Sequence, residues 1–272
     1  MRRPLGSYPL IFLFSVSVFA ALQYTPFFPD PDSFYHTKIA LLLGERGIFQ
    51  EFPWLQATVL KEAYVDHHFF YHVLLIPFVT LFNPLVGIKI ATTLAGAGAL
   101  TMLYAVLRAL PVARPGLWTI LAMTSTGLLY RLNLAKAPGI SILFLLLGVW
   151  LIIRATQART NRQSTILHSS FFILNFLYVW LYAAWPFLLT FTVLWWLSVG
   201  IIQRRSVHQM LLAGVSGIIL GLIVNPFFPE NIQFLWWLVV KVGLINYHNI
   251  LNVGNEWRPL PLLEFVGSNF LV

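Results

Sequence analysis

Residues 85–108 read LVGIKIATTLAGAGALTMLYAVLR, and this stretch decides the class of fold. Its only charges are Lys89, near the start, and Arg108, at the end. A helix of this length rises about 36 Å, and the hydrocarbon core of a bilayer is about 30 Å thick. The stretch is therefore predicted to be a transmembrane helix.

The composition of the whole chain agrees with this prediction. Of its 272 residues, 58% are hydrophobic and 10% are charged, whereas a soluble domain has about 25% charged residues. The chain has no cysteine, which excludes disulfides and a thiol nucleophile. The net charge of +8 comes from basic residues in short clusters between apolar runs. This pattern favours a membrane-topology signal, and no nucleic-acid partner is expected.

Further apolar runs predict an all-α polytopic membrane protein with about seven transmembrane helices, forming a single domain over residues 1–272. The first run is interpreted as an anchor, because a cleavage site at Ala20 matches the signal-peptide rule weakly and many spans follow. Pro138, Pro186 and Pro226 each lie at a predicted helix edge, where proline costs little. The predicted spans are 8–24, 85–108, 116–131, 138–153, 168–184, 186–202 and 210–224.

The segment from His67 to Phe82 is apolar but only about 16 residues long, near the lower limit for a span. If it lies along the membrane surface, all nine acidic residues fall outside and the arginine-rich connections fall in the cytoplasm. Those arginines are Arg2, Arg3, Arg108, Arg114, Arg154, Arg159, Arg162, Arg204 and Arg205.

We therefore expect a multi-pass protein of the cell membrane with a cytoplasmic N-terminus. A long external segment, 25–84, is expected to carry interfacial helices, and long ordered loops tend to carry function. Residues 225–272 are expected to form a late external segment. Because the chain ends inside this segment, an N-terminal fragment of a longer protein is one interpretation.

The long external segment opens with the motif Pro29-Asp30-Pro31-Asp32-Ser33-Phe34-Tyr35-His36. Two carboxylates one residue apart can supply oxygen ligands to a hard divalent cation such as Mg²⁺ or Mn²⁺, which would bind a phosphate. The alternative is that Asp32 caps the following helix and Asp30 is a solvated turn residue.

A helix is predicted from Ser33 to Gly44, with Asp32 or Ser33 as its N-cap and Gly44 or Gly47 as its terminator. An apolar side indicates that this helix lies in the membrane interface. The apolar residues are Phe34, Ile39, Leu42 and Leu43.

A second polar cluster, Tyr64-Val65-Asp66-His67-His68-Phe69-Phe70-Tyr71-His72, opens the segment predicted to lie on the surface. His68 and His72 stand one helical turn apart, a spacing compatible with metal binding, although no further ligand is evident. Anchoring of the segment by histidines and aromatic residues at headgroup depth is the alternative. Asp66 or His67 is a candidate for a substrate or acid–base role.

Arg131 and Lys136 are predicted on the external side, between two spans. Cations at this depth can hold the phosphate of a lipid carrier, or they can be snorkelling anchors. Glu256 lies on the same predicted side and could approach the first loop, with a solvated loop as the alternative.

These features together resemble the GT-C superfamily of membrane glycosyltransferases, most closely the catalytic subunits of oligosaccharyltransferases. The resemblance is carried by Asp30-Pro31-Asp32-Ser33-Phe34-Tyr35-His36 and continues through Lys38-Ile39-Ala40. Weaker similarities are Asp66-His67-His68-Phe69 with Leu74-Leu75-Ile76-Pro77, Asn225-Pro226-Phe227-Phe228-Pro229, and Glu256-Trp257-Arg258-Pro259.

The resemblance implies that Asp32 is the catalytic and metal-binding carboxylate, supported by Asp30, with Glu256 contributing from a late external loop. The implied reaction transfers a sugar or oligosaccharide from a polyprenyl phosphate or diphosphate to an acceptor on the external face. Arg131 and Lys136 would then bind the donor phosphate. Further expected roles are acid–base chemistry for Asp66 and substrate contacts for Tyr35, His36 and His67.

Two alternatives to a glycosyltransferase are a non-catalytic lipid-binding or scaffold protein and an ion-coupled transporter. The family has a second acidic motif after the third span, where this chain has residues 131–136 without a carboxylate. That difference favours a non-catalytic lipid-binding or scaffold protein. An ion-coupled transporter is disfavoured, because the predicted spans carry almost no ionisable residues away from their ends.

Overall fold

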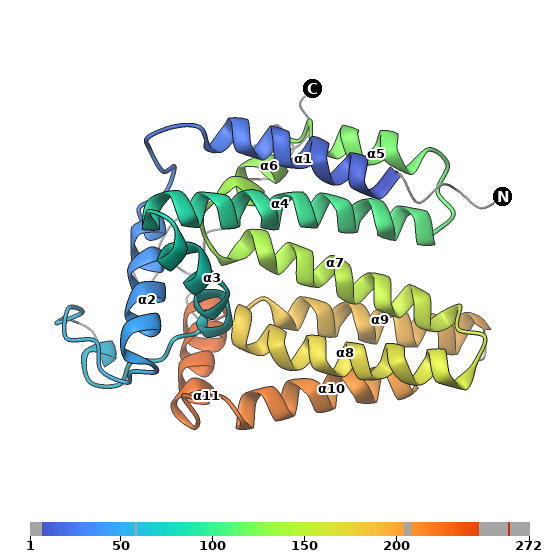
Figure 1. Ribbon diagram of the computed structural model, residues 1–272. Coiled ribbons are helices and arrows are strands. Elements are labelled where there is room, and N and C mark those ends of the chain that lie inside the picture. The colour runs from blue at the N-terminus through green and yellow to red at the C-terminus, as the bar shows by residue number, and fades with distance from the viewer. Residues whose placement is uncertain (1–6, 58, 204–207, 245–260, 262–272) are drawn as a thin grey trace.

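The computed structural model is built from helices, which are the only regular elements among the residues that it describes, 7–57, 59–203, 208–244 and 261 (Figure 1). Two short elements are not α-helical, the 3₁₀ helix at Val59–Lys61 and the π-helix at Trp236–Leu244. The α-helices are α1 (Ser7–Gln23), α2 (Asp32–Arg46), α3 (Phe69–Leu81), α4 (Pro84–Ala109), α5 (Pro115–Ala122), α6 (Thr126–Asn133), α7 (Ala137–Thr156), α8 (Asn161–Leu181), α9 (Trp185–Gln203), α10 (His208–Ile223) and α11 (Glu230–Leu235).

The long helices run side by side, and α2 crosses one end of the bundle at a steep angle to them (Figure 1). By length and composition, α4, α7, α8 and residues Trp185–Ile202 of α9 can each cross a membrane. Three shorter apolar helices, α1, α3 and α10, accompany them. The protein is therefore an all-helical protein whose apolar helices fit a membrane.

The prediction of a single span over residues 116–131 was wrong, because this stretch forms two eight-residue helices, α5 and α6. Arg114 adopts a left-handed backbone and Pro115 begins α5, while the Ser125 side chain accepts a hydrogen bond from the Leu128 N–H at the start of α6. Local capping thus interrupts an apolar run that hydropathy reads as continuous. Together α5 and α6 still carry the chain back to the end of the bundle where α7 begins (Figure 1).

Helix α2 follows the prediction in its length but differs in its cap and its buried face. It ends at Arg46, followed by Gly47 as the C-cap with a φ of 74° that suits glycine, but Pro31 takes the N-cap position and neither Asp32 nor Ser33 caps the helix. Phe34, expected on the apolar side, is exposed, whereas His36 is buried beside Ile39. The buried face of α2 therefore carries an imidazole, and the Asp32 carboxylate is not used as a cap.

Helix α3, expected to lie on the surface, packs against α2, α4 and α8. Its buried residues are Phe69, Tyr71, His72, Leu75 and Val79. The end of α3 approaches α4 closely, since a Cβ on Gly87 would lie 2.1 Å from the carbonyl oxygen of Phe78. Helices α2 and α3 thus form a layer at one end of the bundle (Figure 1).

The pair α8 and α10 depends on glycines that let two backbones approach. A Cβ on Gly217 would lie 2.4 Å from the Phe172 carbonyl oxygen, and a Cβ on Gly221 would lie 2.8 Å from that of Phe176. The Trp180 indole N–H donates to the Gly221 carbonyl at 2.7 Å. Such small-residue contacts are a usual way for helices to associate in lipid, where apolar burial supplies little driving force.

Gly217→Ala is expected to destabilise the protein, because the added methyl group has no room beside Phe172. Overpacking costs about 1–3 kcal/mol, which exceeds the helix-propensity gain of about 1 kcal/mol from replacing glycine. Gly200→Ala on α9 is the matched control, since its Cβ would meet nothing within 4 Å. Thermal unfolding in detergent should show a lower midpoint for Gly217→Ala only, and equal midpoints would contradict this packing.

Candidate functional site

The candidate site lies at the end of the bundle where α2 crosses it, and a link between α1 and α6 organises one side of it. The Gln23 side-chain N–H donates to the backbone carbonyl of Asn133 at 2.7 Å and to its side-chain oxygen at 2.8 Å. Gln23 ends α1 and Asn133 ends α6. This link brings the loop before α2 next to the turn before α7.

Lys136, at the N-cap of α7, lies between the two carboxylates of the first motif. Its Nζ is 2.8 Å from Asp30 Oδ2 and 2.6 Å from Asp32 Oδ2. Asp30 Oδ1 also accepts from the Asp32 backbone N–H at 2.8 Å, which fixes the two acids relative to each other. The three groups, called here the ion cluster, carry a net charge of −1.

The ion cluster holds Lys136 in its charged form. Burial lowers the lysine pKa, but hydrogen bonds and charge attraction from Asp30 and Asp32 outweigh burial, so the pKa is raised above its ordinary value. Asp32 is the most accessible member, with 58% of its side chain exposed. The cluster is therefore a charged site that stays open to solvent.

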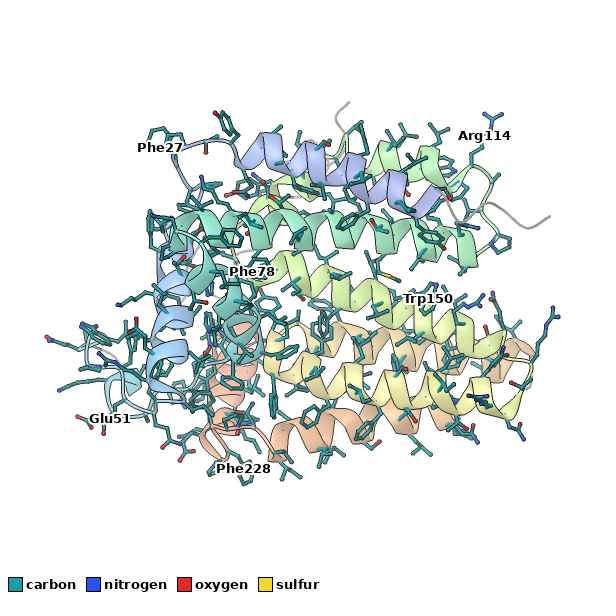
Figure 2. The ribbon with its side chains drawn as sticks, viewed as in Figure 1. Phe27, Glu51, Phe78, Arg114, Trp150 and Phe228 are labelled. Atoms are coloured by element: carbon teal, nitrogen blue, oxygen red, sulfur yellow. The ribbon has the colours of Figure 1, made fainter. Side chains whose placement is uncertain are left out.

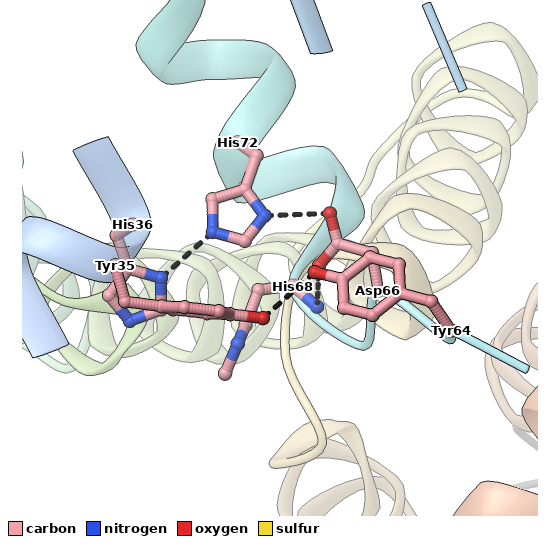
Figure 3. A network of polar contacts seen from close by, with 6 residues as sticks. All are labelled: Tyr35, His36, Tyr64, Asp66, His68 and His72. Carbon is pink, nitrogen blue, oxygen red and sulfur yellow. Dashed lines mark hydrogen bonds and ion pairs between the residues drawn. The ribbon is translucent and has the colours of Figure 1, made fainter. Parts of the chain in front are cut away.

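A second group, called here the histidine chain, is buried one turn further along α2 (Figure 3). Asp66 Oδ2 is 2.7 Å from His72 Nδ1, and His72 Nε2 is 2.8 Å from His36 Nδ1. The other oxygen, Asp66 Oδ1, accepts from the His68 backbone N–H at 3.0 Å. Asp66, His72 and His36 are at most 4% exposed, so their polar atoms depend on one another for partners.

The surroundings keep the imidazoles of His36, His67 and His68 neutral. Burial, followed by the neighbouring histidines and Lys136, lowers the pKa of His36 well below its ordinary value, and the same causes lower that of His68. Burial also lowers the pKa of His67 to about 4, although Asp66 opposes this effect. His36 is consequently an uncharged base at neutral pH.

Two tyrosines close the outer side of the histidine chain (Figure 3). Their hydroxyl oxygens, on Tyr35 and Tyr64, are 2.8 Å apart. Burial raises the pKa of Tyr35 to about 12 and also raises that of Tyr64, so both hydroxyls stay protonated at neutral pH. Tyr64 stacks in turn on Phe49 and Phe52.

A cavity of about 20 Å³ lies behind Asp66 and His67. Its wall is completed by Val65, Val179, Ala183, Asn225, Asn231, Phe234 and Leu235. A space of this size holds a single water molecule. Asn231 donates its amide to the Leu222 carbonyl, while its buried side-chain oxygen has no partner. This cavity suits a water molecule and is too small for a sugar.

The structure brings several predicted residues together and leaves others apart. Asp30, Asp32 and Lys136 form the ion cluster, while His36 and Asp66 join the histidine chain, with Tyr35 and His67 against it. Arg131 is exposed on α6 and has no recorded ion pair within the described ranges. Glu256 lies outside the described residues.

His72 and Tyr64 both belong to the second polar cluster of the sequence, but the contacts that they make here were not predicted. His72 was considered as a metal ligand with His68 or as an anchor at headgroup depth, but it bridges Asp66 and His36. The position of His36 could have indicated this contact. His36 shares one face of α2 with the apolar residues Ile39, Ala40 and Leu43. A buried imidazole on that face needs a hydrogen-bond partner. In the part of the chain that the structure describes, no group of three His, Asp or Glu side chains is arranged to hold a metal ion.

Comparisons of the chain with models of protein families, with curated proteins and with solved structures find no match.

Lys136→Met is expected to lower stability by about 1–3 kcal/mol, the usual loss for hydrogen bonds to charged groups. Because the folded state raises the lysine pKa, this stabilisation is fully present below its ordinary value of 10.5 and is lost as the pH rises through the raised value. Chemical denaturation at pH 7.5 measures the loss. Lys38→Met is the control, since Lys38 is exposed on α2, the helix that carries Asp32. Equal effects of the two substitutions would contradict the ion cluster.

Proposed function

We propose that this chain is a membrane glycosyltransferase. It moves a sugar or oligosaccharide from a polyprenyl-phosphate or diphosphate carrier to an acceptor on the external face of the cell membrane. The observation that carries the proposal is the ion cluster, in which Asp30, Asp32 and Lys136 meet at the end of an apolar helical bundle. A lipid-linked phosphate lies at that depth when the bundle crosses a bilayer.

The distribution of charge supports an external position for this end. The described acidic residues all belong to elements at the end of the bundle where α2 lies, and Figure 2 shows Glu51 and Arg114 at opposite ends. Arg108, Arg154 and Arg162 lie with Arg114, in or beside the connections at the other end. By the positive-inside tendency, the arginine end faces the cytoplasm, as does the N-terminus.

This orientation assigns seven crossings, the third of which is made by α5 and α6 in succession. A broken crossing of this kind is tolerated where it packs on other helices, and α4 lies against both α5 and α6. The segment 24–83 is then external, and α2 and α3 within it cover the end of the bundle.

Lys136 is the proposed contact for the donor phosphate. Its ammonium group has three N–H donors, and Asp30 and Asp32 use two of them. The third is available to a phosphate oxygen, where it stabilises the negative charge that develops as the carrier leaves. Asp32, the exposed carboxylate, then orients the sugar or the acceptor. The roles proposed for Arg131 and Glu256 remain predictions.

A divalent cation, Mg²⁺ or Mn²⁺, was predicted at Asp30 and Asp32. The described residues do not complete such a site, since the ammonium of Lys136 lies between the two carboxylates and no third acidic or imidazole ligand joins them. The proposed chemistry therefore uses only the protein's own side chains.

A lipid-binding or scaffold protein is the second candidate. One observation favours it, because Lys136 partly neutralises both carboxylates of the motif and thereby gives them a structural role. The two candidates differ in whether bound lipid-linked sugar is turned over.

Binding of a polyprenyl-phosphate sugar to the protein in nanodiscs, followed by transfer to added acceptors, tests the proposal. Lys136→Met should weaken binding about 10- to 100-fold, which corresponds to the loss of one charge-assisted contact. Asp32→Ala should abolish transfer, and Lys38→Met should change neither. Binding without transfer by the wild type would favour the lipid-binding candidate, and absence of binding would overturn both.

Mn²⁺ titration monitored by electron paramagnetic resonance tests the cation site. Lys136→Met changes the charge of the cluster from −1 to −2 and vacates the space between the carboxylates, so Mn²⁺ should bind this variant at least about ten-fold more tightly than the wild type. The gain should vanish in Lys136→Met/Asp32→Asn. Tight Mn²⁺ binding by the wild type, lost in Asp32→Asn, would instead establish a metal site beside Lys136.

A further inference from the structure

We propose that Asp66, His72 and His36 form a proton relay whose working end is His36 Nε2, the atom that accepts the proton of an attacking hydroxyl group. The inference rests on the proposed function for the identity of the reaction, and it narrows the acceptor to a hydroxyl compound. The two short contacts of the histidine chain and its burial carry it.

The direction of the hydrogen bonds in the relay follows from Asp66, whose carboxylate accepts hydrogen bonds and cannot donate them. The Asp66 carboxylate can only accept, so His72 Nδ1 carries a hydrogen and donates it to Asp66 Oδ2. The proposed relay has His72 as a neutral imidazole, whose other nitrogen then has a lone pair, so that His72 Nε2 accepts from His36 Nδ1. The same rule leaves His36 Nε2 with a lone pair.

This last nitrogen is available to a substrate. Among the described residues, His36 Nε2 makes no hydrogen bond. It is also not one of the fully buried polar atoms without a partner, so it keeps some accessible surface. The atom is thus neither paired within the described chain nor fully enclosed. An unpaired basic nitrogen that keeps some accessible surface in an otherwise buried side chain is the arrangement that a general base requires.

The groups around His36 keep it uncharged without blocking it. The charged or titratable groups around it come from its own helix, from the start of α3 and from the start of α7. They are Tyr35, Asp66, His67, His68, Tyr71, His72 and Lys136. Burial is the largest influence on its pKa, followed by His72, His67 and Lys136, and all of these lower it. His36 is therefore neutral at pH 7 and ready to take up a proton.

The relay then moves one proton per transfer. The acceptor oxygen bonds to the anomeric carbon as its O–H proton passes to His36 Nε2, and the bond from that carbon to the phosphate oxygen breaks. The electron pair leaves with the polyprenyl phosphate, whose charge faces Lys136. His36 passes its Nδ1 proton to His72 Nε2, so that the positive charge rests beside the Asp66 carboxylate. After product release the protons move back, and His36 Nε2 gives its proton to solvent.

The relay also links the two parts of the site. Asp32 and His36 stand one turn apart on α2, so that their side chains lie on neighbouring positions of the same helix face. A donor phosphate at Lys136 and an acceptor at His36 can therefore be adjacent. An imidazole of this kind suits proton removal from a hydroxyl group of a glycan, a lipid or a protein side chain.

Solid-state NMR of the full chain in proteoliposomes, labelled with ¹⁵N-histidine, tests the relay directly. At pH 7.5, His36 should show a protonated Nδ1 and an unprotonated Nε2, and His72 should show the same tautomer. His36→Gln and His72→Gln assign the signals. Protonation of His36 on Nε2 in the wild type would overturn the relay.

Asp66→Asn provides a second test with a defined outcome. The His68 backbone N–H holds the amide oxygen at the position of Oδ1, so the amide NH₂ must face His72 Nδ1 and donate to it. Both imidazoles should then switch tautomer, which places a proton on His36 Nε2. Glu230→Gln is the control, since it makes the same chemical change at an exposed position at the same end. An unchanged His36 tautomer in Asp66→Asn would contradict the relay.

Turnover separates this inference from the proposed function. In Asp66→Asn, transfer to a hydroxyl acceptor should fall about 100-fold or more while binding of the lipid-linked sugar is retained, as for the loss of a general base. The expected tautomers without transfer to any hydroxyl acceptor would overturn the proposed function and leave the relay intact. Transfer that persists in Asp66→Asn with switched tautomers would overturn the role of His36 as the base.

Discussion

Asp66 and His72 meet at 2.7 Å in a position where neither side chain is more than 4% exposed. Removing one partner would leave the other polar group buried without its hydrogen bond, which costs about 1–3 kcal/mol and more for a charged group. The rest of this end of the molecule is arranged around it. Asp66 receives the His68 N–H at the start of α3, and His72 holds His36 on the buried face of α2. The pair therefore fixes how the layer of α2 and α3 covers the bundle.

The long helices could be predicted because their signal is local. An apolar run of bilayer length has few alternatives, and α4, α7 and α9 begin and end within about three residues of the predicted bounds. The break between α5 and α6 could not be read in the same way, since Ser125 acts by capping α6 and not through hydropathy. Hydropathy averages over a window, and a single capping hydrogen bond is lost in that average.

The site was predictable residue by residue but not as an assembly. Asp30, Asp32 and Lys136 were each selected for their chemistry, yet about 100 residues of chain separate the acids from the lysine, and the Gln23–Asn133 link that joins these segments leaves no pattern in the sequence. His72 was missed for a similar reason, because its partner His36 lies on another helix. Composition and spacing identify reactive groups, whereas their partners depend on how helices pack.

Solvent exposure falls steeply over one turn of α2. This difference in exposure decides which chemistry each part of the site can perform. Asp32 is 58% exposed, Lys136 is 20% exposed, and His36 is 3% exposed. Charged groups are retained at the open end, where solvation makes their cost small, and the base lies where burial keeps it neutral. A ligand with a charged head that enters from the open side therefore meets the ion cluster first and the imidazole second. A site used only to bind lipid would need the first of these groups, whereas the proposed transfer reaction would use both.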